Sequence, residues 1–268
     1  MYATSYNSLQ VLEFSTLNNE WPVRYGFSTR LGGVSTGVYE SLNLGFRPGD
    51  DQANVVENRM RFCTAIGAPT DRFVGPGLSH LANVAVIDDE SLFGGFSAPG
   101  TGPRNTDALV TSAKRVALFV TSADCSLTLL FDPLHMVLAV IHAGWRGAAL
   151  NIHSSVVRTM QLLYQTEPRH LFAGIGPTVS ADSYQISTTR VDTLIALHGE
   201  TVAAEVCQNR GGHYHLNIPA LLVHQLRFLG VENIETSEFS TDMNTDLLFS
   251  ARRDGETGRF ALLAFIDD

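Results

Sequence analysis

The sequence predicts an α+β fold, because strands and helices mix without the strict strand–helix alternation of a doubly wound sheet. Apolar runs rich in β-branched residues crowd between residues 108 and 142, with only short polar breaks. Helical patterns lie on both sides of this region. A hydrophobic content of 44% in 268 residues is enough for a sizeable core. No repeat or linker divides the chain, so we expect one domain over residues 1–268.

The first clear element is a helix in "GDDQANVVENRMRFCTAIG", which Asp50 or Asp51 can cap and Gly67 can end. Arg59 points the same way as the apolar side chains of this helix. Its guanidinium either reaches the surface past the apolar face or is buried with a carboxylate or phosphate partner. The residues that share this face at helical spacing are Val55, Arg59, Phe62, Cys63 and Ile66.

Next come four buried strands, predicted at 108–112, 116–121, 126–131 and 136–142. The segment "RGAALNIHSSVVRTMQLLYQ" then predicts one helix, and "LFAGIGP" a short strand. "IPALLVHQLRFLGV" predicts a helix that ends near Gly230. "LLFSARRDGETGRFALLAFI" predicts two strands around a turn at Asp254-Gly255. The helix after Arg146 is expected to bury Ala149, Ile152, Val156, Met160 and Leu163.

The composition narrows the classes of partner and compartment. A net charge of −9 argues against nucleic acid or an anionic membrane, although local arginines can still bind a small anion. The start has no signal-peptide pattern, and no apolar run approaches the roughly 20 residues of a membrane span. Three cysteines without close spacing fit a reduced, cytoplasmic protein better than a disulfide scaffold.

His142 stands at the end of a predicted strand, just before "AGWRG". Side chains at such strand ends face a cleft, and the unpaired N–H groups of the following helix start can hold an anion. Arg146 and Gly147 are therefore candidate anion-binding residues. The ordinary alternative is a strand–helix connection that happens to contain a histidine, with Trp145 packed beneath the turn.

Cys125 occupies a similar junction between "ALFVTSAD" and "SLTLLFD". It could be a thiolate nucleophile activated by His142. It could also bind zinc or copper with His142 and His80, which leaves a fourth position open for water or substrate. The plain alternative is a buried cysteine beside two hydrogen-bonded histidines. His213 and His215 could chelate a metal on a strand, but more simply form a polar face beside a turn.

Several long motifs bear on this choice, and together they cover the chain from about Gly26 to Ile266. The chain resembles the YfiH-like family, which is also called the laccase-domain, multicopper polyphenol oxidase or peptidoglycan editing factor family. The resemblance implies a layered α-β-β-α sandwich with mixed sheets, similar to deamidating toxins that use a Cys–His pair. The motifs are "TRLGGVSTGVYESLNLGFRPGDDQANVVENR", "TDALVTS", "SADCSLTLLFDP", "IHAGWRGAALNI", "GIGPTVSADSYQI" and "FSARRDGETGR".

The resemblance implies a metal site of His80, Cys125 and His142. It also adds Asn43, in "SLNLG", to the candidate substrate- or anion-binding residues Arg59, Arg146 and Gly147. The three ligands are retained, whereas their surroundings depart from the family pattern, and such changes alter rate and substrate choice. The departures are Leu78 for a glutamine, Leu127 for a proline, Asp182, Ser183 and Gln185 in place of a Cys and a Glu, and Ser240 for a cysteine.

The function implied is a zinc-dependent purine nucleoside enzyme, which cleaves adenosine or inosine with phosphate and deaminates adenosine. A copper-dependent polyphenol oxidase is the first alternative, but one Cys-His-His site does not supply the paired histidine clusters of a multicopper centre. A Cys–His thiol hydrolase of peptidoglycan editing is the second. A binding protein with a structural zinc is the third, disfavoured by the open coordination position. The expected cofactor is Zn²⁺, with Cu²⁺ as the alternative.

Overall fold

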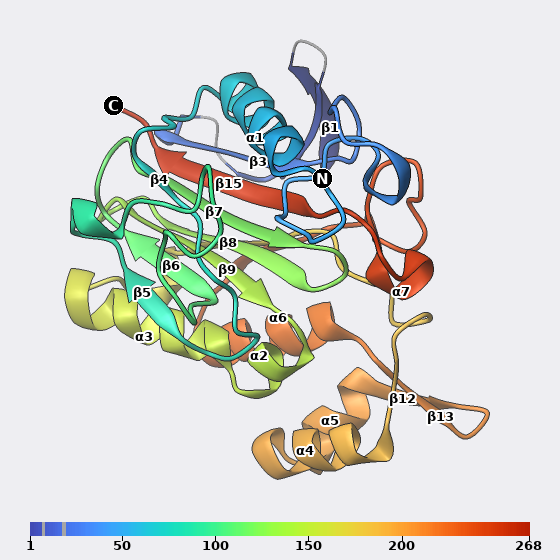
Figure 1. Ribbon diagram of the computed structural model, residues 1–268. Coiled ribbons are helices and arrows are strands. Elements are labelled where there is room, and N and C mark those ends of the chain that lie inside the picture. Colours follow the sequence, from blue (N-terminus) through green and yellow to red (C-terminus); the bar gives the residue numbers. More distant parts are fainter. Residues whose placement is uncertain (7–8, 18–19) are drawn as a thin grey trace.

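Two six-stranded sheets pack face to face in the computed structural model, which describes residues 1–6, 9–17 and 20–268 (Figure 1). One helix covers the outer face of the first sheet, and three helices cover the outer face of the second. The layers therefore run α-β-β-α. The predicted α+β sandwich with mixed sheets is confirmed.

The first sheet has the strand order β1-β2-β3-β15-β7-β4. All its pairs are antiparallel except β4 with β7, which is parallel. This sheet joins both ends of the chain, because the C-terminal strand β15 pairs with β3 from the N-terminal region. On its other side β15 pairs with β7. Its strands are β1 (Tyr2–Tyr6), β2 (Leu9–Glu13), β3 (Val23–Ser28), β4 (Phe73–Val74), β7 (Ala117–Ser122) and β15 (Phe260–Ile266).

The second sheet has the order β14-β10-β8-β9-β6-β5, and its two edge strands pair in parallel with their neighbours. Its central strands β8 and β9 are buried along their whole length. The four strands predicted between residues 108 and 142 are confirmed with small shifts at their ends. The strands are β5 (Val84–Val86), β6 (Ala108–Thr111), β8 (Ser126–Asp132), β9 (Val137–Ala143), β10 (Phe172–Ile175) and β14 (Asn233–Thr236).

A smaller unit projects from the second sheet's side of the sandwich (Figure 1). It holds a three-stranded sheet in the order β11-β13-β12, with two helices beside it. None of these elements was predicted from the sequence. They are β11 (Gln185–Ile186), α4 (Thr188–His198), α5 (Glu200–Val206), β12 (Cys207–Arg210) and β13 (His213–Leu216).

Three hydrophobic clusters hold the layers together. Between the sheets, Phe27 and Leu262 of the first meet Phe131 of the second. Outside them, Phe62 of α1 packs on the first sheet, and Ile152 of α3 on the second. Each fully buried side chain of this size contributes roughly 1.5–3 kcal/mol of transfer free energy. The remaining helices are α1 (Gln52–Ile66), α2 (Trp145–Ala149), α3 (Ile152–Tyr164), α6 (Ile218–Phe228) and α7 (Ala251–Asp254), with short 3₁₀ turns η1 (Gly37–Tyr39), η2 (Glu90–Leu92) and η3 (Pro168–His170).

Helix α1 follows its prediction closely. The Asp51 side chain accepts a hydrogen bond from the Ala53 N–H, and Gly67 ends the helix with a left-handed backbone. All five residues predicted to share its inner face are buried. Local signals were sufficient here, because both caps and the apolar face lie within one segment.

Two predictions are wrong in part. The segment after Arg146 forms two helices, because Asn151 takes a left-handed backbone at φ 61° and breaks the run. Leu163, predicted to share the face of Met160, is 58% exposed, whereas Met160 is in the core. Residues before Asp254 form no strand. Ser250 instead caps the short helix α7 by accepting from the Arg253 N–H.

His153 on α3 makes stability depend on pH. Its Nε2 lies 3.0 Å from Thr128 Oγ1, and its Nδ1 has no partner among the described residues. Burial lowers the pKa of His153 to about 3. The unfolded chain then binds the proton more readily, so stability should fall as pH drops from about 6.5 toward 3, by about 2 kcal/mol at pH 5.

Urea denaturation of a His153→Gln variant between pH 7 and 5 checks this expectation. The variant should lose much less stability on acidification than the parent, because glutamine does not titrate. His224→Gln, which removes a half-buried histidine at the surface of α6, should follow the parent profile. Identical pH dependence in parent and His153→Gln contradicts the assignment.

Candidate metal centre

Two chain crossings between the sheets meet at one site. Strand β7 belongs to the first sheet and β8 to the second, and Cys125 lies in the link between them. The link from β4 to β5 also passes from the first sheet to the second, and it carries His80. His142 on β9 lies opposite Leu127 of β8 in the strand register. The topology of the sandwich therefore brings together residues far apart in sequence.

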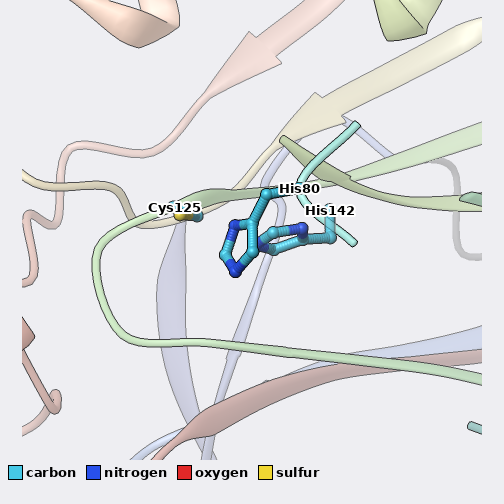
Figure 2. A group of neighbouring side chains, drawn as sticks. All are labelled: His80, Cys125 and His142. Atoms are coloured by element: carbon cyan, nitrogen blue, oxygen red, sulfur yellow. The ribbon is translucent and has the colours of Figure 1, made fainter. Parts of the chain in front are cut away.

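The ligand atoms of His80, Cys125 and His142 all lie within 4.8 Å of one another (Figure 2). The two imidazole rings stand edge to face, with their centroids 4.8 Å apart. His142 is buried, Cys125 is half-buried and His80 is exposed, so the group is open on the side of His80. No other group of three potential ligands occurs in the part of the chain that the structure describes.

Asp107, directly before β6, orients two of these residues. It is fully buried, and its Oδ1 lies 3.0 Å from His142 Nδ1. Because an ionised carboxylate only accepts, His142 Nδ1 carries the proton and its Nε2 is left free for a ligand. Three backbone N–H groups also donate to the Asp107 carboxylate, from Ser79, His80 and Leu81.

Asp107 was not among the site residues predicted from the sequence. Its signal was available, since an aspartate directly before a buried strand in "TDALV" needs donors. Burial raises the pKa of Asp107, but hydrogen bonds from His142 and Ser79 and from the Leu81 N–H lower it more, to about 2. The carboxylate is therefore ionised at neutral pH, and it fixes both the tautomer of His142 and the loop of His80.

The electrostatics favour a thiolate at Cys125. Burial alone raises the pKa of the thiol, but the charge of His142 and hydrogen bonds from His142 and His80 bring it down to about 6. Burial likewise lowers the pKa of His142, whereas the Cys125 thiolate and Asp107 raise it to about 9. The pair is thus a thiolate beside an imidazolium, unless a cation takes the place of the proton.

This donor set fits a metal ion. One thiolate and two imidazoles are ligands that both zinc and copper accept, and three protein ligands leave a position for substrate. The hydrogen bond from His142 to Asp107 is the usual support of a metal-bound histidine. The residues present therefore fit the implied cofactor, and the arrangement alone does not choose between zinc and copper.

The three residues lie in the wall of a cavity of about 490 Å³. Arg47, Arg59 and Arg259 also line it, together with Phe46 and Phe119. No aspartate or glutamate is among the lining residues that the structure describes. Although the protein as a whole is acidic, this cavity is locally cationic and suits an anionic ligand.

The other predicted site residues lie as follows. Arg59 is buried and lines the cavity, but its partners are carbonyl oxygens of Leu44, Gly95 and Phe96 instead of a carboxylate. Asn43 is buried behind the wall, where its Oδ1 accepts from the N–H groups of Gly45 and Arg259. It shapes the cavity without lining it.

Arg146 and Gly147 are outside the cavity lining. Arg146 is exposed and stacks on the Trp145 ring at 5.1 Å, while Arg190 approaches that ring at 4.5 Å. The geometry therefore does not bring Arg146 to the candidate metal ligands. Arg47 and Arg259, which the sequence analysis passed over, stand in the cavity instead.

The departures from the family pattern are distributed unevenly around the site. Leu78 lines the cavity, and Leu127 is fully buried beside His142 in the sheet. Gln185 lies in the small sheet and hydrogen-bonds His213 Nδ1 at 2.9 Å, whereas Ser240 is tied to Asn244. His215 Nδ1 lies 3.1 Å from the Ala181 carbonyl. His213 and His215 thus form a polar face, in line with the simpler alternative.

Comparison with known proteins identifies the family. A family model described as multi-copper polyphenol oxidoreductase laccase matches residues 24–267. The chain belongs to this family. It is 34% identical over 248 residues to a purine nucleoside phosphorylase of Mycobacterium tuberculosis, covering 91% of this chain and 92% of the relative. It is 30% identical over 269 residues to purine nucleoside phosphorylase YlmD of Bacillus subtilis, covering 98% and 95%.

Solved structures of this laccase-domain family share the fold. Hypothetical protein YfiH of Bacillus licheniformis superimposes with a TM-score of 0.88 at 27% identity, covering 97% of each chain. YlmD of Geobacillus stearothermophilus gives a TM-score of 0.86 at 30% identity, covering 92% of this chain and 93% of that one. Among the described residues, no helix is long and apolar enough to cross a membrane.

Proposed function

We propose that this protein is a zinc-dependent purine nucleoside phosphorylase of the cytoplasm, which also deaminates adenosine. The observation that carries the proposal is one cavity with two kinds of chemistry in its wall. It has a potential metal triad and three arginines, and no carboxylate among its described lining residues. The names of the relatives that are 30–34% identical support the same reaction.

Phosphorolysis makes defined demands on such a cavity. An oxygen of phosphate forms a bond to C1′ of the ribose while the bond from C1′ to the base breaks. The base leaves with the electron pair and takes up a proton. The arginines suit this reaction, because they hold the phosphate dianion and keep it close to a cationic sugar.

A bound zinc ion supplies a Lewis acid and a water of lowered pKa, which suits deamination of the purine ring. His80, Cys125 and His142 would hold it. Asp107 keeps the His142 ring oriented, with its Nε2 toward the cavity and its Nδ1–H occupied. The buried position of His142 and its carboxylate excludes water from this side of the site.

A thiol hydrolase is the second candidate, because Cys125, His142 and Asp107 form a nucleophile–base–carboxylate chain. It needs no metal, and its nucleophile would be the Cys125 thiolate. Polyphenol oxidation finds less support. The described residues offer one three-ligand group, whereas oxygen reduction by a laccase uses several coppers.

Replacing Cys125 by serine separates these functions. The purified parent should contain about one equivalent of zinc and convert inosine and phosphate to hypoxanthine and ribose 1-phosphate. The Cys125→Ser variant should lose most of the zinc and at least about a hundredfold in kcat/KM, about 2.7 kcal/mol of transition-state stabilisation. Elemental analysis and chromatography of the products measure both quantities.

Cys207→Ser is the matched control, since Cys207 lies in β12 of the small sheet and away from the cavity. It should retain zinc and activity. Base release that does not require phosphate contradicts the phosphorylase. Amide hydrolysis by a zinc-free preparation that iodoacetamide stops indicates the thiol hydrolase, and copper-dependent turnover of phenols alone indicates the oxidase.

A further inference from the structure

Arg59 is a buried cation with no anionic partner in the described part of the chain. It is 5% exposed, lies on the inner face of α1 and still lines the cavity. None of the ion pairs between described residues includes it. A buried charge without a counter-charge is costly, so its retention at a cavity wall indicates a ligand that supplies the charge.

The contacts of Arg59 fix its direction without neutralising it. Nε donates to the Leu44 carbonyl at 2.8 Å, and Nη1 donates to the carbonyls of Gly95 and Phe96. The guanidinium also contacts two aromatic rings, 4.2 Å from the centroid of Phe46 and 4.8 Å from that of Phe119. Nη2 makes no hydrogen bond to any residue the structure describes, so its N–H groups are free to donate to a ligand.

Two further arginines share the cavity. Arg259 is held from behind, since its Nη1 donates to the carbonyls of Thr257 and Gly258, each at 2.9 Å, and its N–H donates to Asn43. Burial and then the charge of Arg47 lower the pKa of Arg259. Arg47 is exposed at the mouth of the cavity. The like charges of Arg47 and Arg259 repel each other, and an anion between them would remove the repulsion.

We propose that Arg47, Arg59 and Arg259 form the binding site for inorganic phosphate, a tetrahedral dianion. Its role as co-substrate rests on the proposed phosphorylase function, whereas the binding itself does not. Arginine suits this ligand because its planar guanidinium donates two parallel hydrogen bonds to neighbouring phosphate oxygens. We therefore assign anion binding to these three arginines and not to the predicted site at Arg146 and Gly147, which lies outside the cavity.

Along β7, Arg59 lies farther from the metal ligands than Arg259 does, because Arg259 directly precedes Phe260, which pairs with Ser122. Arg59 packs on Phe119, whereas the Ser122 hydroxyl donates to the Cys125 carbonyl beside the metal ligands. Phe119 and Ser122 are three residues apart along β7, which is about 10 Å of strand. The three arginines therefore extend from Phe119 toward the metal end of the cavity.

Calorimetric titration of the zinc-loaded, full-length protein with inorganic phosphate tests the site directly. Arg47→Ala and Arg259→Gln should each raise the Kd for phosphate about tenfold or more, because a charged hydrogen-bond partner is lost. In turnover with inosine, the KM for phosphate should rise more than kcat falls. Arg158→Ala on α3 removes an equal charge at an exposed position outside the cavity, and it should bind phosphate like the parent.

The outcomes separate the two proposals. If both variants bind phosphate like the parent, or if Arg146→Ala carries the loss, the three-arginine site is wrong. If phosphorolysis occurs with an unchanged KM for phosphate in both variants, the site is wrong and the phosphorylase stands. If phosphate binding depends on the arginines but no nucleoside is cleaved, the anion site stands and the phosphorylase is wrong.

Discussion

Replacing Asp107 by asparagine should weaken zinc binding about 10- to 100-fold, the usual effect of losing a carboxylate that supports a metal-bound histidine. The substitution keeps the shape of the side chain but removes its charge. It also turns an NH₂ group toward a set of donors, namely the N–H groups of His80 and Leu81 or His142 Nδ1. His142 then loses its fixed tautomer, and the loop of His80 loses its anchor. Competition with a chelating dye measures the change.

Asp132→Asn is the matched control. Asp132 is also fully buried and also holds a histidine, since its Oδ2 lies 2.9 Å from His135 Nδ1. It lies at the far end of β8, where it accepts from the backbone of the next turn. Its loss should cost folding stability while zinc affinity stays near the parent value. Equal zinc affinity in Asp107→Asn and the parent contradicts the role assigned to Asp107.

The elements predicted correctly from the sequence are those that interactions within one short segment determine. Helix α1 carries its own caps and apolar face, and the strands from β6 to β9 are continuous apolar runs. The metal triad is different, because its members come from two crossings between sheets and from β9. The motifs suggested the trio, but no local spacing required it, and only the topology shows that the three side chains meet.

Arg146 shows where local reasoning fails. The pattern of glycines before a helix favours an anion site, and the helix does begin at Trp145. The Arg146 side chain nevertheless stacks on Trp145 at the surface. Besides Arg59, the cavity takes its cations from Arg47 and Arg259, which are far apart in sequence. Which of several arginines enters a cavity depends on packing between distant segments.

The wrong strand before Asp254 has a similar cause. The apolar residues there fit a hairpin, but the buried carboxylate of Asp124 accepts from Ser250 Oγ at 2.6 Å and from the Arg252 N–H at 2.6 Å. These hydrogen bonds join residues more than 120 positions apart in the sequence, and they favour the start of α7 over a strand. The same carboxylate is the neighbour of Cys125, so the site itself decides the local structure of a distant segment.

Gly144→Ala is expected to disrupt the metal centre, for a reason that lies in the glycines of "HAGWRG". The backbone at Gly144, with φ −75° and ψ 178°, is open to any residue. Space is the constraint, because a Cβ there would lie 2.9 Å from Cys125 Sγ and 3.4 Å from His80 Nδ1. The thiolate would have to turn away from the two histidines. We expect zinc affinity to fall more than about tenfold, with about 1–3 kcal/mol of lost stability from the overpacking.

Gly77→Ala tests whether the effect is specific to that close approach. Gly77 also lines the cavity, but a Cβ there would meet nothing closer than 3.8 Å. It should keep zinc and stability near the parent values in chelator competition and urea denaturation. If Gly144→Ala binds zinc as tightly as Gly77→Ala, the Cys125 thiolate is not held against Gly144. The glycine before Trp145 would then serve the chain turn alone. A selective loss of zinc in Gly144→Ala instead means that the turn exists to let the backbone pass directly behind two metal ligands.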